Sequence, residues 1–345
     1  MPACSRTFEA HDSRDTPRKI PTSSTRSMTG PAVDVNGLTK RFRSRTAVDD
    51  LTLFIPAGTI AGFIGPNGAG KTTTLRMLLG LIRPTSGEGM DLGEPIGRPE
   101  RYLSNVGALI ESPAFYPSLS GHRNLTALAV LGGHDTRRVD AVLQQVGLAD
   151  RGQDAYRTYS LGMKQRLGIA AALLADPLLL ILDEPTNGLD PAGIRDMRDL
   201  LRAVAGDGRT ILVSSHLLAE LEHVADWLII VAHGRSVYQG PARDFMATSS
   251  RSVLLRPEHL DQIGALGSLI ERQDLAVQRE GDRLRLTLPE EGDSTQETDQ
   301  LLARLVRTAF QHEMVLVEIE RVHATLEERY QTLVEEAAPG REPGR

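Results

Sequence analysis

Short apolar runs alternate with segments of helical periodicity along most of the chain, from Val33 to about Ala247. The apolar runs have the length of buried strands, and they fall at 51–55, 59–64, 178–182, 210–213 and 227–231. Strands separated by helical segments predict a largely parallel sheet covered by helices. Helical patterns dominate about 100–158, including 121–131 and 136–146, where Ser120 and Asp135 are suited to cap the helices. The pattern therefore predicts an α/β core with an inserted helical subdomain at about 100–165.

A different pattern begins at about residue 248. Strand patterns occur at 252–256, 275–279 and 283–288, and helical patterns occur at 258–272, 296–309 and 323–336. These periodicities are typical of a folded unit. We predict a small accessory α+β domain over 248–337 with a regulatory role, and we find no motif of catalytic or ligating residues in it. The alternative is an inert appendage that only shields apolar surface of the core.

Both ends of the chain lack apolar periodicity. Residues 1–30 are rich in Ser, Thr, Pro and Arg, and residues 338–345 are rich in Pro and Gly, so we expect two disordered tails. The first tail contains no apolar stretch of the kind found in a secretory signal. A transit peptide, which Glu9, Asp12 and Asp15 would interrupt, and a translation start at Met28 are alternatives for this region.

Length, charge and cysteine content limit the classes of function and partner that fit this chain. A chain of 345 residues suggests about two domains. Its net charge of −6 argues against a nucleic-acid partner bound through bulk electrostatics. Cys4 is the only cysteine, which excludes an intrachain disulfide and favours a reducing cytoplasm. The longest apolar region, 168–182, is interrupted by Asp176-Pro177 and is shorter than the roughly 20 residues of a membrane-spanning helix. A role at a membrane would therefore depend on a partner.

The strand at 59–64 leads into a P-loop motif, G-x-x-x-x-G-K-[ST]. A helical pattern follows it, which is the context that a phosphate-binding loop requires. We expect the Lys71 side chain to reach the β- and γ-phosphates of a nucleotide and the Thr72 hydroxyl to hold Mg²⁺. A glycine-rich turn with a chance lysine is the alternative. The expected phosphate-binding residues are Gly65, Pro66, Asn67, Gly68, Ala69, Gly70, Lys71, Thr72 and Thr73.

Two carboxylates end the apolar strand at 178–182. Ligands of open α/β sheets bind at the carboxyl ends of the strands, so we expect Asp183 and Glu184 beside the phosphates. Asp183 is suited to hold Mg²⁺, and Glu184 is suited to orient and deprotonate the attacking water. In isolation, a solvated strand end would explain this acidic pair equally well. Its combination with a P-loop favours the catalytic interpretation.

A third pattern precedes these acids. Ser160-Leu161-Gly162-Met163-Lys164-Gln165 opens a helical segment that runs to Leu174. Ser160 is suited to cap this helix, and the helix N-terminus would present N–H groups and partial positive charge to an anion.

Five motifs in this order resemble those of ABC-transporter ATPase subunits over about 33–247. They correspond to the family's Walker A, signature, Walker B, D-loop and switch-histidine motifs: Gly65–Thr72, Ser160–Gln165, Leu178–Glu184, Asn187–Asp190 and Ser214–His216. The resemblance implies a P-loop ATPase core and two ATPase subunits that close head-to-tail over two ATP molecules.

Particular residues take roles from this resemblance. Ser160, Gly162 and Gln165 would face the γ-phosphate held by the partner's P-loop. His216 would contact the γ-phosphate of its own site, and Asp190 would cross the dimer interface. Phe42 occupies the position at which the family stacks an aromatic ring on adenine. Without the resemblance, Phe42 would be interpreted as a core residue and His216 as a surface histidine.

Two departures from the family pattern refine the resemblance. The signature reads SLGMKQ, and Glu111 occupies the position of the Q-loop glutamine, followed by Ser112-Pro113. Both features, with the following Ala114-Phe115-Tyr116-Pro117, resemble the bacitracin-resistance and lantibiotic-immunity exporter subunits. A carboxylate at position 111 can still ligate Mg²⁺ or position water, so catalytic activity should survive the change.

The expected function is ATP hydrolysis coupled to export of a drug, peptide antibiotic or other amphipathic molecule. The resemblance implies a separate transmembrane permease, a second ATPase subunit, the ligands ATP and Mg²⁺, and a peripheral position on the cytoplasmic face of the membrane. The alternative is an ABC ATPase of translation or DNA repair, which transports nothing. Such proteins typically carry two cassettes, a long coiled coil or a zinc insertion, and the sequence contains none of these patterns.

Overall fold

The computed structural model describes residues 30–110, 114–247, 251–273, 275–288, 295–323 and 326–336. The expected N-terminal tail lies outside the described residues except for Gly30, and so do the alternative start at Met28 and the expected tail at 338–345. The candidate residue Glu111 lies outside them as well.

A six-stranded sheet forms the centre of the core unit, by which we mean residues 33–247. Its strand order is β10-β9-β3-β8-β7-β6, and every pair is parallel except β10 with β9. The parallel sheet predicted from the apolar runs is confirmed, except that the run at 51–55 lies in an antiparallel strand of the second sheet. The strands are β3 (Ile60–Ile64), β6 (Val106–Leu109), β7 (Leu179–Asp183), β8 (Thr210–Ser215), β9 (Trp227–Ala232) and β10 (Arg235–Pro241).

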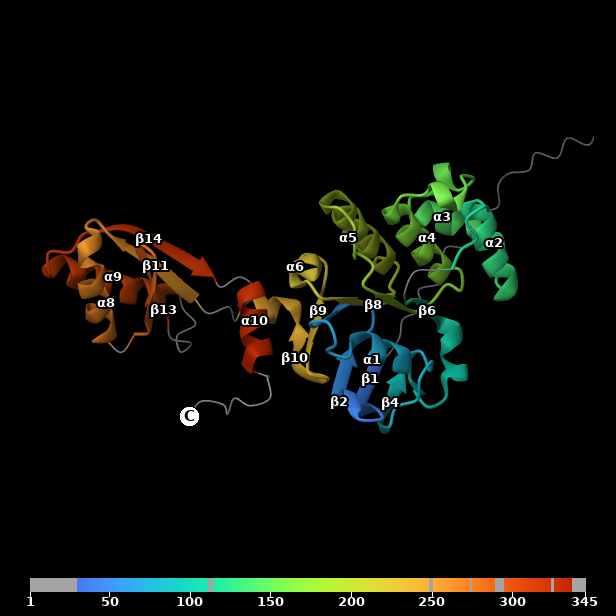
Figure 1. The fold of residues 1–345 in the computed structure, drawn as a ribbon, viewed down its shortest axis with the longest axis horizontal. Coiled ribbons are helices and arrows are strands. Elements are labelled where there is room, and N and C mark those ends of the chain that lie inside the picture. The colour runs from blue at the N-terminus through green and yellow to red at the C-terminus, as the bar shows by residue number, and fades with distance from the viewer. Residues whose placement is uncertain are drawn as a thin grey trace, which may run out of the picture.

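A second sheet, antiparallel and four-stranded, lies below the first in Figure 1. It contains β1 (Val33–Phe42), β2 (Arg45–Ile55), β4 (Ser86–Asp91) and β5 (Glu94–Pro95). Helix α1 (Lys71–Leu78) belongs to the apolar cluster that joins the two sheets, because Leu75, Met77 and Leu78 are buried there with residues of both. The phosphate-binding loop is thus held between two packed layers.

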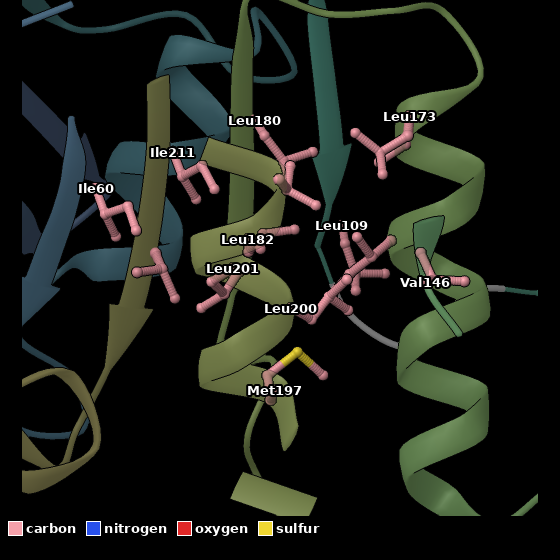
Figure 2. Close-up of a cluster of buried hydrophobic side chains, with 14 of the residues drawn as sticks. Ile60, Leu109, Val146, Leu173, Leu180, Leu182, Met197, Leu200, Leu201 and Ile211 are labelled. Carbon is pink, nitrogen blue, oxygen red and sulfur yellow. The ribbon is translucent and has the colours of Figure 1, made fainter. Parts of the chain in front are cut away.

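Helices cover the opposite face of the six-stranded sheet, and Figure 2 shows part of this interface. Leu180 and Leu182 of β7 face Met197 and Leu201 of α5, and all four side chains are buried. Ser120 caps its helix as predicted, since its hydroxyl accepts a hydrogen bond from Arg123 N–H. The helices are α2 (Gly121–Leu131), α3 (Arg138–Gln145), α4 (Leu161–Leu173), α5 (Pro191–Ala205) and α6 (Leu218–Leu221).

The prediction of a continuous run of helices over about 100–158 is wrong at its start. Only short 3₁₀ turns occur at 99–101 and 103–105, and Val106–Leu109 forms strand β6 at the edge of the six-stranded sheet. This four-residue apolar run has no periodicity that separates a strand from a helix. Parallel pairing with β7 decides its conformation.

The C-terminal unit, residues 251–323, contains an antiparallel sheet with the order β12-β13-β11-β14. Its own apolar cluster lies between this sheet and two helices. The predicted helix at 258–272 is shorter in the structure, and the predicted helix at 323–336 begins only after a strand. The elements from the end of the core unit are α7 (Ala242–Ala247), β11 (Arg251–Pro257), α8 (Ile263–Glu271), β12 (Val277–Glu280), β13 (Arg283–Thr287), α9 (Thr295–Gln311) and β14 (Leu316–His323).

The last helix, α10 (Leu326–Glu336), returns to the core unit and lies beside α6 and β9 (Figure 1). Tyr330 is buried in the apolar cluster of the core unit. The guanidinium carbon of Arg329 lies 4.4 Å from the ring centroid of Phe245 in α7, and Arg329 also donates a hydrogen bond to the Phe245 carbonyl. The helix assigned by sequence to the accessory domain therefore contributes to the apolar cluster of the core unit.

Candidate nucleotide-binding and hydrolysis site

The P-loop connects β3 to α1 and encloses the Lys71 side chain. The Nζ of Lys71 donates a hydrogen bond to the carbonyl of Gly65 at 2.7 Å, and the side chain is only 6% exposed. Gly70 precedes the helix with a φ of 101°, a conformation that favours glycine. The N-terminus of α1 thus lies beside a buried ammonium group, which is an arrangement suited to phosphate.

Two glycines of the loop have no room for a side chain. A Cβ at Gly65 would lie 2.4 Å from the carbonyl oxygen of Val231, and a Cβ at Gly70 would lie 2.5 Å from that of Ala47. Neither backbone atom can move aside without disturbing a strand. The tight packing around the loop explains why the motif requires glycine at these positions.

The carboxyl end of β7 meets the start of α1. Thr72 Oγ1 lies 2.7 Å from Asp183 Oδ2, and Ser214 Oγ donates to Asp183 Oδ1 at 2.5 Å. The same Ser214 oxygen accepts a hydrogen bond from Glu184 N–H at 3.0 Å. One hydroxyl at the end of β8 therefore positions both acids. Ser214 belongs to the switch-histidine motif, but the motif does not indicate this role, because the hydrogen bond joins two strands.

Glu184 lies between a lysine and a histidine. Its Oε1 is 3.2 Å from Lys71 Nζ, and its Oε2 is 2.6 Å from His216 Nδ1. The backbone of Glu184 adopts a φ of 49°, which non-glycine residues rarely do. This left-handed turn directly after β7 directs the carboxylate back toward the P-loop. A base oriented by a neighbouring histidine and beside the phosphate loop is suited to activate water.

A cleft of about 430 Å³ opens beside these residues. The lining residues include Lys71, Thr72 and Glu184, and Phe42 of β1 contributes an aromatic ring that is 47% exposed. The cleft is therefore lined by phosphate-binding groups and by an aromatic surface. Sequence reasoning missed Arg45, which lines it from the start of β2. No motif contains Arg45, and only the hairpin between β1 and β2 brings it there.

The oxygen atoms of Thr72 and Asp183 fit a magnesium ion. Mg²⁺ is usually bound through one or two carboxylates, hydroxyls and substrate phosphates rather than by a complete cage of protein ligands. The described residues contain no cluster of three or more His, Cys, Asp or Glu side chains that could hold a metal ion.

The signature residues are not among those that line the cleft. Ser160 caps α4 with its hydroxyl, which accepts from Met163 N–H at 3.3 Å, and its side chain is exposed. Gly162 and Gln165, both half-buried, follow in the same helix. The structure thus brings together the Walker motifs and His216 within one chain, and it leaves the start of α4 exposed and outside the cleft.

The D-loop lies next to the signature helix. A Cβ built on Gly162 would contact Leu189, and one on Gly188 would lie 3.1 Å from Leu161. Asp190 caps α5, because its Oδ1 accepts a hydrogen bond from Gly193 N–H at 2.9 Å. This capping bond is a local structural role that uses one carboxylate oxygen of Asp190. The other oxygen can make a further contact.

No helix in the described part of the chain is long and apolar enough to cross a membrane.

The family model that describes ABC transporters matches residues 48–187. Three relatives extend this match. The ABC transporter ATP-binding protein YhcH of Bacillus subtilis (strain 168) is 40% identical over 75% of this chain and 85% of its own length. The bacitracin transport ATP-binding protein BcrA of Bacillus licheniformis is 42% identical, covering 66% and 79%. The lantibiotic transport ATP-binding protein SrtF of Streptococcus pyogenes is 40% identical, covering 59% and 89%.

The fold agrees with a solved structure. A crystal structure of the ADP conformation of an ATP-binding cassette of an ABC transporter aligns with a TM-score of 0.58 and 20% identity. The alignment covers 62% of this chain and 92% of that one. Together with the sequence relatives and with the grouping of Lys71, Asp183, Glu184 and His216, these likenesses show that the chain belongs to the ATP-binding, ATP-hydrolysing subunits of ABC transporters.

Proposed function

We propose that this chain is the ATP-hydrolysing subunit of an ABC exporter. It would couple ATP binding and hydrolysis to transport of a drug, peptide antibiotic or other amphipathic molecule through a separate membrane subunit. The observation that carries the proposal is the position of Glu184, whose carboxylate lies within reach of both Lys71 and His216 at the mouth of the nucleotide cleft.

The positions of the site residues support the following proposed roles. Lys71 and the N–H groups of α1 bind the phosphates, and Phe42 stacks on adenine. Thr72 and Asp183 would hold Mg²⁺, which would neutralise charge on the phosphates when bound. Glu184 takes a proton from water, and His216 orients Glu184 and contacts the γ-phosphate. The proposed role of Glu111 at the metal rests on the sequence alone, because it lies outside the described residues.

A second subunit completes the site in this proposal. Ser160 and Gly162 are exposed or half-buried at the start of α4 and do not line their own cleft, which supports their use by a partner. The helix N-terminus would add N–H groups and partial positive charge to the γ-phosphate held by that partner. Asp190 belongs to the D-loop, which is adjacent to the start of α4, and it would lie at the same interface.

The names of two relatives support the proposed class of transported molecule. BcrA and SrtF are named for transport of bacitracin and of lantibiotics, and they are 42% and 40% identical to this chain. We therefore propose export of a peptide antibiotic or a similar amphipathic molecule, and a peripheral position of this subunit on the cytoplasmic face of the membrane.

The test is ATP-dependent transport in inside-out vesicles. The chain is expressed with a multi-span membrane subunit, to be sought among the neighbouring reading frames, and uptake of bacitracin, a lantibiotic and an unrelated hydrophilic peptide is measured. Uptake of an amphipathic compound that requires ATP and is lost in Glu184→Gln supports the proposal. ATP hydrolysis without uptake of any compound, combined with binding of the purified chain to ribosomes or DNA, would favour a non-transport ATPase instead.

A further inference from the structure

A buried carboxylate connects the two loops that carry the catalytic groups. Glu220 in α6 is 7% exposed, and its Oε2 accepts hydrogen bonds from Thr186 Oγ1 at 2.6 Å and from Ser215 Oγ at 2.7 Å. Thr186 follows Glu184 by two residues, and Ser215 directly precedes His216. A single side chain outside the cleft thus holds both the loop after the catalytic base and the end of the switch-histidine strand.

This arrangement restrains the two catalytic side chains relative to each other. Ser215 also accepts a hydrogen bond from Leu217 N–H at 2.9 Å, which fixes the backbone on both sides of His216. A buried carboxylate is costly unless its oxygens are satisfied, and here the satisfying groups are two hydroxyls of catalytic loops. Loss of either bond would free one loop to move.

The helix that carries Glu220 depends on its neighbours. Helix α6 spans only Leu218–Leu221, so few hydrogen bonds of its own maintain it. Arg198 of α5 donates to the carbonyls of Glu220 at 2.8 Å and Ala219 at 2.6 Å, and Arg202 donates to that of His223 at 2.5 Å. Because Asp190 of the D-loop caps α5, these bonds also link α6 to the helix that follows the D-loop.

The last helix of the chain supports α6 from the other side. Helix α10 contacts α6 and β9, and Tyr330 is buried in the same apolar cluster as Leu218 and Leu221 of α6. Arg329 anchors α10 through the ring and the carbonyl of Phe245. A displacement of α10, which follows the C-terminal unit in the chain, would remove packing from the element that carries Glu220.

We propose that Glu220 is a positioning residue for ATP hydrolysis and that α10, by holding α6, lets the C-terminal unit control the rate of the chemical step. The proposal rests on the proposed roles of Glu184 and His216. It assigns Glu220 no contact with nucleotide. Nucleotide affinity should therefore depend on the P-loop, whereas kcat should depend on the contacts that join α6 to the two catalytic loops.

The first experiment compares Glu220→Ala, Glu220→Gln and the wild type as purified full-length protein. A glutamine carbonyl can still accept both hydroxyl groups, and alanine cannot. We expect Glu220→Ala to lower kcat roughly tenfold or more with the Kd of an ATP analogue unchanged, and Glu220→Gln to retain most activity. An equal loss in Kd and kcat, or a wild-type kcat in Glu220→Ala, would contradict the proposal.

A double-mutant cycle separates positioning from general stability. If Glu220 acts through His216, Glu220→Ala should cause little further loss of kcat when added to His216→Ala. Independent losses that multiply would overturn the assignment. A comparison of the wild type with Glu184→Gln tests the proposed function itself. The proposed ATPase roles would be rejected if the wild type had no ATPase activity or if Glu184→Gln were fully active.

The second experiment tests α10 through hydrogen exchange. In Tyr330→Ala we expect faster amide exchange over 214–222, together with a lower kcat and an unchanged Kd. Gln331→Ala is the matched control, because Gln331 is exposed on the same helix. Exchange over 214–222 that is identical in Tyr330→Ala and wild type would show that α10 does not hold α6.

Discussion

The ammonium group of Lys71 lies 3.2 Å from the carboxylate of Glu184, so the phosphate-binding cation and the proposed base are paired in the structure. Both side chains are largely buried, with 6% and 22% exposure. Incoming phosphate oxygens would compete with Glu184 for the same ammonium group. Nucleotide binding should therefore release the carboxylate toward water and His216, which links binding to activation of the base.

Glu184→Gln should separate binding from hydrolysis. The amide cannot accept a proton from water, so we expect kcat to fall by roughly 10²–10⁴-fold. The P-loop is unchanged, and the Kd of an ATP analogue should stay within a few fold of the wild-type value. Gel filtration with ATP should show an accumulated dimer. Glu88→Gln, a change at an exposed carboxylate of β4, is the control, and wild-type turnover in Glu184→Gln would refute the assignment of the base.

Lys71→Ala should weaken nucleotide binding itself. Charge-assisted hydrogen bonds contribute roughly 1.5–3 kcal/mol, so the Kd for an ATP analogue should rise by about ten- to a hundredfold. Isothermal titration measures this directly. Lys71→Arg should be similarly impaired, because a planar guanidinium does not fit the space in which the ammonium group bonds to Gly65. An unchanged Kd in both variants would contradict the phosphate-binding role of the loop.

Ser160 and Lys71 should act across two subunits. Mixing a Ser160→Arg chain with a Lys71→Ala chain leaves one composite site with both wild-type groups, whereas each homodimer has none. We expect ATPase activity of the mixture to exceed that of either variant alone. The measurement requires heterodimers to be demonstrated by differential tagging. With heterodimers present and no recovery, two independently working composite sites would be excluded.

Asp91→Asn should change how stability depends on pH. Asp91 is fully buried, neither carboxylate oxygen has a hydrogen-bond partner among the described residues, and burial raises its pKa from 3.8 to about 8. Between these two values the folded state holds a proton that the unfolded state has lost. Wild-type stability should therefore fall as pH rises from about 4 to about 8.

The asparagine variant removes this contribution. The free energy of unfolding of Asp91→Asn minus that of the wild type should increase as the pH rises. The total increase should be roughly 1.4 kcal/mol for each unit by which folding raises the pKa of the Asp91 carboxyl. Urea denaturation of both proteins at pH 5 and pH 8 measures the difference. Equal pH dependence of the two proteins would show that Asp91 ionises normally in the folded state.

The local chemistry of this protein could be read from short segments. The P-loop, the strand ending in Asp183 and the helix capped by Ser160 each depend on residues close together in the chain, and the structure has the strands and helices that these segments predict. Local patterns are informative because hydrogen bonding in helices, capping and strand alternation act over a few residues. The same patterns could not separate strand β6 from a helix, because its four residues gain their partner only from β7.

Contacts between distant segments were decided by the tertiary structure alone. Ser214 bridges the two acids only because β8 lies beside β7, and Glu220 reaches Thr186 only because α6 folds under that loop. The periodicity of α10 predicts a helix with an apolar face but does not say which surface covers that face. Tyr330 packs into the core unit and Arg329 packs on Phe245, so the core unit covers this face. The sequence of α10 could not show this, because burial requires a second surface that lies elsewhere in the chain.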